Sequence, residues 1–121
     1  AEILKKIKGK GGLTAYLGTC DGIEIEKRIS EGDEYAKLVY SALPYQVAKE
    51  IGALSTVLKG KVDAILLTGG LAYSNMVVDD IAARVAHLGP VKVYPGENEM
   101  EAMAMNGFMA LNHEIEVKKY V

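Results

Sequence analysis

The sequence predicts an α/β fold that is rich in helix and contains a small parallel sheet. Two short apolar runs, Val62–Leu67 and Val91–Tyr94, are typical of strands, and each leads through a loop into a helical pattern. This order of strand, loop and helix, given twice, is that of doubly wound sheets, in which ligands bind at the carboxyl edge. Because Val62–Leu67 is almost continuously apolar, we expect this strand to be covered on both faces.

The amino-terminal segment is expected to be helical and interrupted by glycine-rich turns, because clustered glycines break regular structure. Thr19 and Asp21 lie on the second of these turns, and the mixed charges that follow indicate a helix with a solvated outer face. The expected elements are a helix at 2–8, a breaker at 9–12, a strand stub or helical turn at 13–17, a turn at 18–22 and a helix at 24–29.

The strongest helical pattern follows Gly32, with Asp33 as its N-cap and Glu34 in the first turn. It spans about 27 residues, or roughly 40 Å at ~1.5 Å per residue. Pro44 lies inside it, where a missing N–H and a ring clash cost about 3 kcal/mol in a straight helix. We therefore expect a kink at Pro44 or two abutting helices. The apolar residues that define the pattern are Val39, Leu43, Val47, Ile51, Leu54 and Leu58.

The helix after each predicted strand has a cap that the sequence identifies. Ser74 is expected to cap the first of them, and Gly89–Pro90 ends it. Asn98 is expected to cap the last helix, with Glu101 three residues on, as in a capping box. The inner stripe of the first of these helices is expected to be Val78, Ile81, Ala82 and Val85.

Composition restricts the class of partner. The 121 residues are 50% apolar, which is ample for a core, and carry a net charge of −2. No basic surface favours nucleic acid or an anionic membrane, so we expect neither as a partner and a small ligand instead. The single Cys20 and the absence of a signal-type segment or long apolar span indicate a reducing cytoplasm. His87 and His113 lack metal-type spacing and are expected on the surface at helix ends.

The double glycine after the first strand indicates a nucleotide site. Glycine lacks a Cβ, so the backbone at Gly69 and Gly70 can take positive φ and let a base or phosphate approach closely. Free amides of the helix that Ser74 opens suit a phosphate. The chain has neither a P-loop nor a Gly-x-Gly-x-x-Gly motif, so a plain tight turn is the alternative interpretation of this loop.

Four segments occur in a distinctive order: Gly18–Asp21, Gly32–Glu34 with Ala48–Ala53, Val62–Gly70 and Val91–Glu97. In sequence and spacing they resemble the carboxyl-terminal part of the butyrate kinases, over nearly the whole chain. Butyrate kinases group with acetate kinases, sugar kinases and actin, which close two related α/β domains over a nucleotide. The resemblance implies that residues 1–121 are a carboxyl-terminal nucleotide-binding subdomain, a helix-rich part of an actin-like (ribonuclease H-like) kinase domain. The start at Ala1, directly in a helical pattern, agrees with an absent amino-terminal domain.

The resemblance also implies the chemistry: the γ-phosphoryl group of ATP passes to the carboxylate of butyrate, giving butyryl phosphate and ADP. ATP or ADP and Mg²⁺ are the implied cofactors, a short-chain fatty acid is the implied substrate, and a homo-oligomer is the implied assembly. No catalytic residue is assigned, because the arginines and the acyl pocket would lie outside this chain, and we expect the piece alone to be inactive. The alternatives are a non-catalytic oligomerisation module, an acetate or branched-chain fatty-acid kinase relative, and an actin-like or sugar-kinase relative.

Site residues follow from the resemblance, position by position. The glycine loop against the nucleotide corresponds to Gly69, Gly70, Leu71 and Ala72, with Ser74 and Asn75 bordering it. The loop on the other side corresponds to Gly18, Thr19 and Asp21. Glu99 corresponds to a glutamate associated with the Mg²⁺ of the nucleotide, an ion that needs only one or two protein carboxylates.

The chain departs from the family pattern at two positions: Ile23 stands where an arginine is expected, and Pro44 stands in the long helix. Structural alternatives also stay open. Asp21 can cap the helix that follows it, and the charge of Glu99 can stabilise the first turn of its helix by interacting with the helix dipole. Tyr73 can stack on a base or simply pack. The methionines Met100, Met103, Met105 and Met109 are expected to fill a core or an interface.

Overall fold

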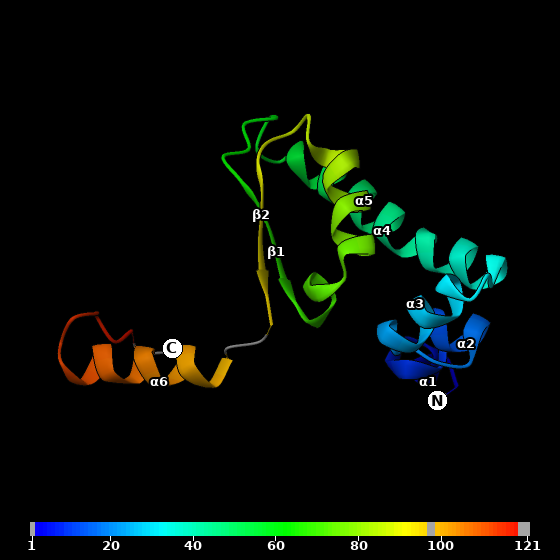
Figure 1. The fold of residues 1–121 in the computed structure, drawn as a ribbon. Coiled ribbons are helices and arrows are strands. Elements are labelled where there is room, and N and C mark those ends of the chain that lie inside the picture. The colour runs from blue at the N-terminus through cyan, green and yellow to red at the C-terminus, as the bar shows by residue number, and fades with distance from the viewer. Residues whose placement is uncertain (1, 97–98, 119–121) are drawn as a thin grey trace.

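The computed structural model describes residues 2–96 and 99–118, and Figure 1 shows its helices and strands in order. The helical elements of the amino-terminal half are α1 Glu2–Lys5, η1 Lys6–Lys10, α2 Leu13–Leu17, α3 Gly22–Ser30 and α4 Glu34–Ser55. The remaining elements are β1 Ile65–Gly69, η2 Gly70–Tyr73, α5 Asn75–Val85, β2 Val91–Pro95 and α6 Glu99–Leu111.

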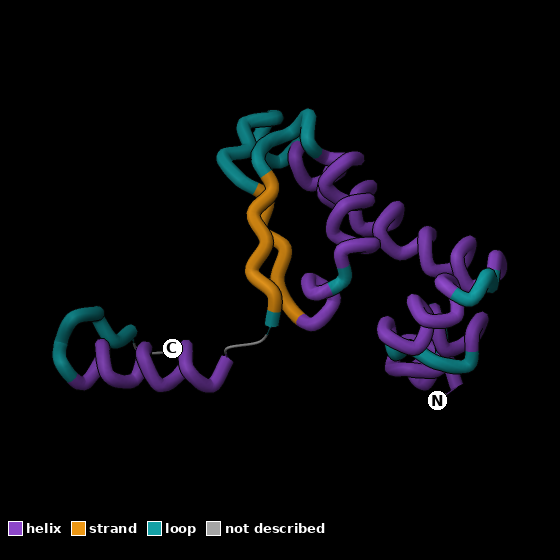
Figure 2. The backbone as a smooth tube through the Cα atoms, in the orientation of Figure 1, coloured by secondary structure: helices purple, strands orange, loops and turns teal. Residues whose placement is uncertain are grey.

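The sheet consists of β1 and β2, which pair in parallel (Figure 2). The register places Ile65 opposite Val91 and Gly69 opposite Pro95. Because α5 connects the two strands, the predicted strand, helix and strand unit with a small parallel sheet is confirmed. The first strand begins at Ile65, three residues later than the sequence indicated, and ends in the double glycine.

Only one face of this sheet is covered within the described chain, so the prediction of cover on both faces is wrong. Ile65 is buried among residues of α4 and α5, and Leu67 packs against the same core. Leu66, on the opposite face, is 61% exposed, and Tyr94 is 56% exposed. Both faces of the strand carry apolar side chains, which explains the apolar run in the sequence. The helices of the described chain cover only one of these faces.

The core lies between α3, α4, α5 and the inner face of the sheet. Its largest fully buried side chains are Tyr40, Ile25 and Val85. On α4 the buried stripe is Ala36, Tyr40, Pro44 and Ala48, at a regular spacing of four. The stripe predicted from Val39 is therefore displaced by one residue: Val39, Leu43 and Ile51 are only partly buried, and Leu54 and Leu58 are exposed.

Helix α4 runs without interruption through Pro44, so the prediction of two abutting helices is wrong. Pro44 is buried within the packed stripe, and this burial offsets the missing hydrogen bond. A bend at Pro44 stays a prediction. The helix ends at Ser55, earlier than the pattern indicated, and from Thr56 to Leu58 the backbone N–H groups donate to carbonyls three residues back instead of four.

The predicted N-cap at Asp33 is confirmed, since its carboxylate accepts from the Ala36 N–H at 2.8 Å. Arg28 stabilises the same turn, between α3 and α4. Its guanidinium donates to Asp33 Oδ2 at 2.8 and 3.0 Å and to the Leu17 carbonyl at 3.0 Å. One side chain therefore ties the end of α2 and the start of α4 to α3.

The amino-terminal segment differs slightly from expectation. Helical structure continues through Gly9 to Lys10 as the π-helical η1, so Gly9 does not break it. Leu13–Leu17 is the helical turn α2, which settles the choice against a strand stub.

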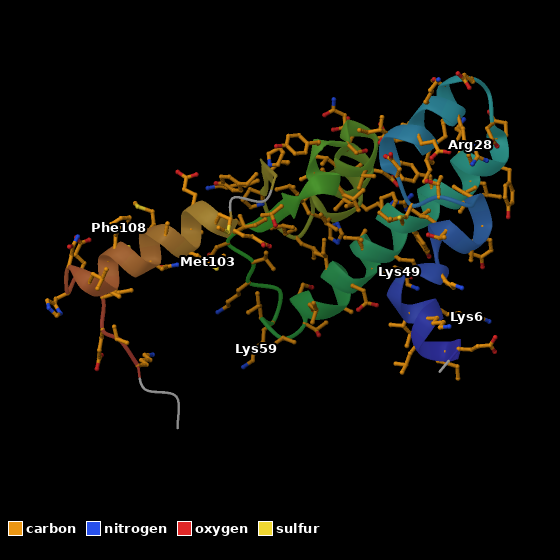
Figure 3. The ribbon with its side chains drawn as sticks, turned by 90° about the horizontal axis from the view of Figure 1, so that it is seen from below. Lys6, Arg28, Lys49, Lys59, Met103 and Phe108 are labelled. Atoms are coloured by element: carbon orange, nitrogen blue, oxygen red, sulfur yellow. The ribbon has the colours of Figure 1, made fainter. Side chains whose placement is uncertain are left out.

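Helix α6 extends away from the sheet and the other helices in Figure 1 and buries none of its residues. Met103 and Phe108 lie along it (Figure 3) and are 61% and 63% exposed. Met100 and Met105 are exposed as well, so these methionines fill no core within the described chain. Asn98, the expected cap of this helix, and Glu97 lie outside the described residues.

His87 and His113 are exposed just beyond the ends of α5 and α6, as predicted. Across residues 2–96 and 99–118, no helix has both the length and the apolar character needed to cross a membrane.

Candidate functional site

The two loops singled out in the sequence converge on one hollow of about 480 Å³, which we call the loop hollow. This volume is in the range of small-molecule sites. Four predicted site residues, Asp21, Gly70, Leu71 and Ser74, line the loop hollow. The complete lining is Cys20, Asp21, Gly22, Ile23, Glu26, Tyr40, Gly70, Leu71, Tyr73 and Ser74.

The first loop is shaped by hydrogen bonds to its own backbone. Thr19 Oγ1 accepts from the Asp21 N–H at 3.2 Å, and Asp21 Oδ1 accepts from the Ile23 N–H at 2.9 Å. Asp21 is therefore the N-cap of α3, and the structural alternative for this residue is confirmed. Gly18 ends α2 in the left-handed conformation, with φ 78°. Gly18 and Thr19 do not line the loop hollow. They form the turn that leads into Cys20 and Asp21, which do line it.

The glycine loop requires positive φ at one of its two glycines. Gly69 has φ 85° and ψ −176°, a conformation that essentially only glycine adopts, whereas Gly70 is outside the positive-φ region. A Cβ added at either position would meet open space. The surface over both glycines is therefore free for a ligand to approach.

Leu71 and Ala72 have different roles in the following turn, η2. Leu71 faces the loop hollow and is 45% exposed. Ala72, which the resemblance placed against the nucleotide, is buried and instead lines a cavity beneath the turn with residues of α4. Ala72 therefore packs the turn against the protein interior and does not face the loop hollow.

Tyr73 is exposed and lines the loop hollow, and its hydroxyl lies over Gly96, where an added Cβ would be 2.8 Å from it. Tyr73 therefore contacts Gly96 through its hydroxyl end, and most of its ring remains exposed.

Ser74 caps α5 as predicted, because its hydroxyl oxygen accepts from the Val77 N–H at 3.1 Å. The same hydroxyl donates to Glu26 Oε1, and the Tyr40 hydroxyl donates to that oxygen at 3.0 Å. Burial raises the pKa of the Tyr40 hydroxyl above its usual value, the nearby Ser74 hydroxyl acts in the opposite direction, and the hydrogen bond to Glu26 adds to the rise.

Sequence reasoning missed Glu26 and Tyr40. Glu26 belongs to a run of mixed charges that was assigned to a solvated face, and its partner Ser74 is 48 positions away. Tyr40 does carry a signal, because Ala36, Tyr40, Pro44 and Ala48 recur every four residues. No comparable local signal marks Glu26.

A second hollow of about 500 Å³ lies where the strands end, and we call it the strand-end hollow. Gly69 and Glu99 line it, so the structure does not place Glu99 with Asp21. Among the residues that the structure describes, no three or more His, Cys, Asp or Glu side chains gather in a metal-type group. The full lining is Thr68, Gly69, Tyr94, Pro95, Gly96, Glu99 and Ala102.

The loop hollow is mostly apolar and has an acidic edge. Asp21 and Glu26 are the charged residues of its lining. Ile23, at the position where an arginine was expected, is 83% exposed. Such a surface suits a flat, uncharged ring with hydrogen-bond donors better than a phosphate group.

Comparison with known proteins gives consistent matches. The Acetokinase family matches residues 1–120. The chain is 50% identical over 119 residues to butyrate kinase 2 of Clostridium acetobutylicum, covering 98% of this chain and 33% of that protein. It is 52% identical over 119 residues to a probable butyrate kinase of Bacteroides thetaiotaomicron, covering 98% of this chain and 34% of that protein. The chain thus spans about a third of the length of these relatives.

Proposed function

Because the chain belongs to the acetokinase family, we propose that it is the carboxyl-terminal nucleotide-binding subdomain of a two-domain butyrate kinase. The whole protein would transfer the γ-phosphoryl group of ATP to a carboxylate oxygen of butyrate, giving butyryl phosphate and ADP. The observation that carries this proposal is the convergence of Asp21 with Gly70, Leu71 and Ser74 on one hollow. The choice of butyrate over acetate or a branched-chain acid rests on the names of the relatives. The proposal places the protein in the cytoplasm, where the free, exposed Cys20 stays reduced.

We assign the nucleoside part of the ligand to the loop hollow. Ile23, Leu71 and Tyr73 present apolar surface there, on which an adenine ring can lie. The Asp21 carboxylate attracts the hydroxyl and amino donors of a nucleoside, and both acidic residues of the hollow, Asp21 and Glu26, repel phosphate oxygens. The charge distribution therefore favours phosphates that extend away from this hollow.

The phosphates are assigned to the surface over Gly69 and Gly70. These two consecutive glycines line the strand-end hollow and the loop hollow respectively, and no Cβ occupies the space above them. Glu99 lines the strand-end hollow, and its carboxylate would bind a phosphate-bound Mg²⁺ there. A metal ion bound there would neutralise the charge of the phosphates. Cationic side chains for the transfer itself would come from the rest of the protein.

Isothermal titration of Mg·ADP into the chain tests this assignment, with Gly70→Val and Glu99→Gln as variants. The valine side chain would project into open space and not into the protein, so it blocks a ligand without disturbing the core. Glu99→Gln retains the shape of the side chain and removes the charge that a cation needs. The proposal expects Gly70→Val to abolish binding, and Glu99→Gln to make ADP affinity independent of Mg²⁺.

Gly107→Val serves as the matched control, because Gly107 is exposed on α6, meets open space and lines neither hollow. It should bind Mg·ADP like the unaltered chain. Binding that survives Gly70→Val unchanged would overturn the assignment of the glycine loop. Absence of binding to the well-folded, unaltered chain would overturn the nucleotide half-site.

The second candidate is a non-catalytic role in assembly, and the exposed apolar surface of α6 favours it. Met100, Phe108 and Leu111 are 78%, 63% and 77% exposed. Sedimentation velocity over a range of protein concentrations distinguishes the two roles. Self-association without Mg·ADP binding supports assembly, and Mg·ADP binding by a monomer supports the nucleotide site.

A further inference from the structure

We propose that Glu26 is a positioning residue for the nucleotide loop: its carboxylate ties the start of α5, and with it the Gly69–Gly70 turn, to helix α3. The inference rests on the proposed function, because it concerns the residue that holds the same site in shape. Glu26 does not correspond to any position that the family resemblance or the motifs singled out.

Hydrogen bonds through Ser74 link Glu26 to the start of α5. The Ser74 hydroxyl proton goes to Glu26 Oε1, which leaves the hydroxyl oxygen free to accept from the Val77 N–H at 3.1 Å. A hydroxyl has one proton to donate, so the carboxylate fixes the direction of that proton and aims a lone pair at the helix. Glu26 therefore sets the geometry of the cap as well as the position of Ser74.

Glu26 is itself held in place by a second hydrogen bond. Tyr40, on α4, is 1% exposed and donates to the same carboxylate oxygen at 3.0 Å. The Tyr40 hydroxyl lies close to the first loop, since a Cβ added to Gly22 would be 3.1 Å from it. The network thus joins α3, α4 and the start of α5 at one oxygen.

The glycine loop is held at its two ends. At the first end, the backbone of Gly69 exchanges hydrogen bonds with that of Gly96, at 3.1 and 3.2 Å. Leu71 and Tyr73 are 45% and 71% exposed, and of the residues between Gly70 and Ser74 only Ala72 is buried. Ser74 is the next residue along the chain with a bond into the rest of the protein. Charge-assisted bonds of this kind, partly removed from water, are among the stronger hydrogen bonds in proteins.

The electrostatic effect of Glu26 on an anionic ligand has the opposite sign to its positioning effect. A carboxylate that lines the loop hollow repels the phosphates of ADP, so removal of its charge alone would strengthen binding. Removal of the acceptor would release Ser74 and weaken binding. Weaker binding on loss of the side chain is therefore a result that charge alone cannot give.

Three variants separate these effects. Glu26→Gln removes the charge and keeps a carbonyl acceptor, Glu26→Ala removes both, and Glu24→Ala removes an exposed charge from the same helix. Two quantities are measured: the Kd of Mg·ADP by calorimetry, and the hydrogen-exchange rate of the Val77 amide by NMR. Thermal unfolding of each variant fixes a temperature at which all are folded.

For Glu26→Ala we expect about tenfold weaker Mg·ADP binding and on the order of tenfold faster exchange at Val77, the size of one lost charged hydrogen bond. Glu26→Gln should bind as well as the unaltered chain or better. Glu24→Ala should leave exchange at Val77 unchanged. If Glu26→Ala does not fold, Ser74→Ala breaks the same bond from its other end, and it is expected to weaken binding to a similar degree.

The inference is overturned if Glu26→Ala, or Ser74→Ala in its place, binds Mg·ADP as tightly as the unaltered chain. It is also overturned if Glu26→Gln loses as much affinity as Glu26→Ala, because the retained acceptor would then rescue nothing. Failure of the unaltered chain to bind Mg·ADP overturns the proposed function instead. Exchange at Val77 still reports in that case whether Glu26 holds the cap.

Discussion

Gly69 and Gly70, the two glycines of the glycine loop, should respond in opposite ways to the same substitution. Gly69 has φ 85° and ψ −176°, and Gly70 lies outside the positive-φ region, yet a Cβ at either meets no atom within 4 Å. Alanine at Gly69 therefore introduces backbone strain alone, of about 1–3 kcal/mol. Part of this is offset by about 0.4–1 kcal/mol, because alanine reduces the freedom of the unfolded chain. A net loss of about 1–2 kcal/mol follows.

Gly70→Ala carries no such strain and lies in a short helical turn, where alanine is the better residue by up to about 1 kcal/mol. Urea unfolding followed by circular dichroism measures both variants. With a slope of roughly 1–1.5 kcal/mol per molar, the midpoint for Gly69→Ala should fall by about 1 M, and that for Gly70→Ala should be unchanged or higher. Equal losses in the two variants, or a larger loss for Gly70→Ala, would refute the argument from φ.

Three further predictions concern caps and ionisable groups. Asp21→Ala should lower the unfolding free energy by about 1 kcal/mol, while Asp21→Asn, which keeps an acceptor for the Ile23 N–H, should change it by only a few tenths in the same urea assay. Hydrogen bonds from the Ala36 N–H and Arg28 hold the pKa of Asp33 below its usual 3.8, so its contribution is present above about pH 4 and is lost as pH falls further. Asp33→Asn should therefore flatten the acid limb of stability against pH, and an unchanged acid limb would contradict this. Burial raises the pKa of Tyr40 above its usual 10.0, so its contribution is present below that pH and is lost as pH rises. Tyr40→Phe should flatten the alkaline limb, and tyrosinate absorbance should show one late-titrating tyrosine fewer.

The sequence predicted features that depend on residues within a few positions of one another. The caps at Asp33 and Ser74 are of this kind, since each side chain accepts from an N–H three residues on. The parallel pairing of β1 and β2 also follows from local order, because a helix between two strands leaves little choice of direction. The loop hollow follows only in part from local order: Asp21 and Ser74 stand at helix starts, but the expectation that their loops flank one ligand came from the family resemblance.

The features that sequence reasoning missed are set by distant partners. Glu26 is charged and lies among charges, and only its bond to Ser74 and Tyr40 draws it into the site. Ala72 was placed against the ligand, but the packing of α4 beneath the turn buries it. Glu99 lines a hollow with Gly69, as its assignment to the glycine loop requires, but this hollow is not the one that Asp21 lines.

The uncovered face of the sheet has a thermodynamic consequence. Leu66 and Tyr94 remain largely in contact with water in the folded chain. Their hydration shells are therefore present both before and after unfolding, and they add little to the heat-capacity change of that transition. Any polypeptide that covers this face removes the shells, so its docking should have a negative heat-capacity change. Such an association would weaken on cooling, and calorimetry at several temperatures would separate it from contacts made by charges.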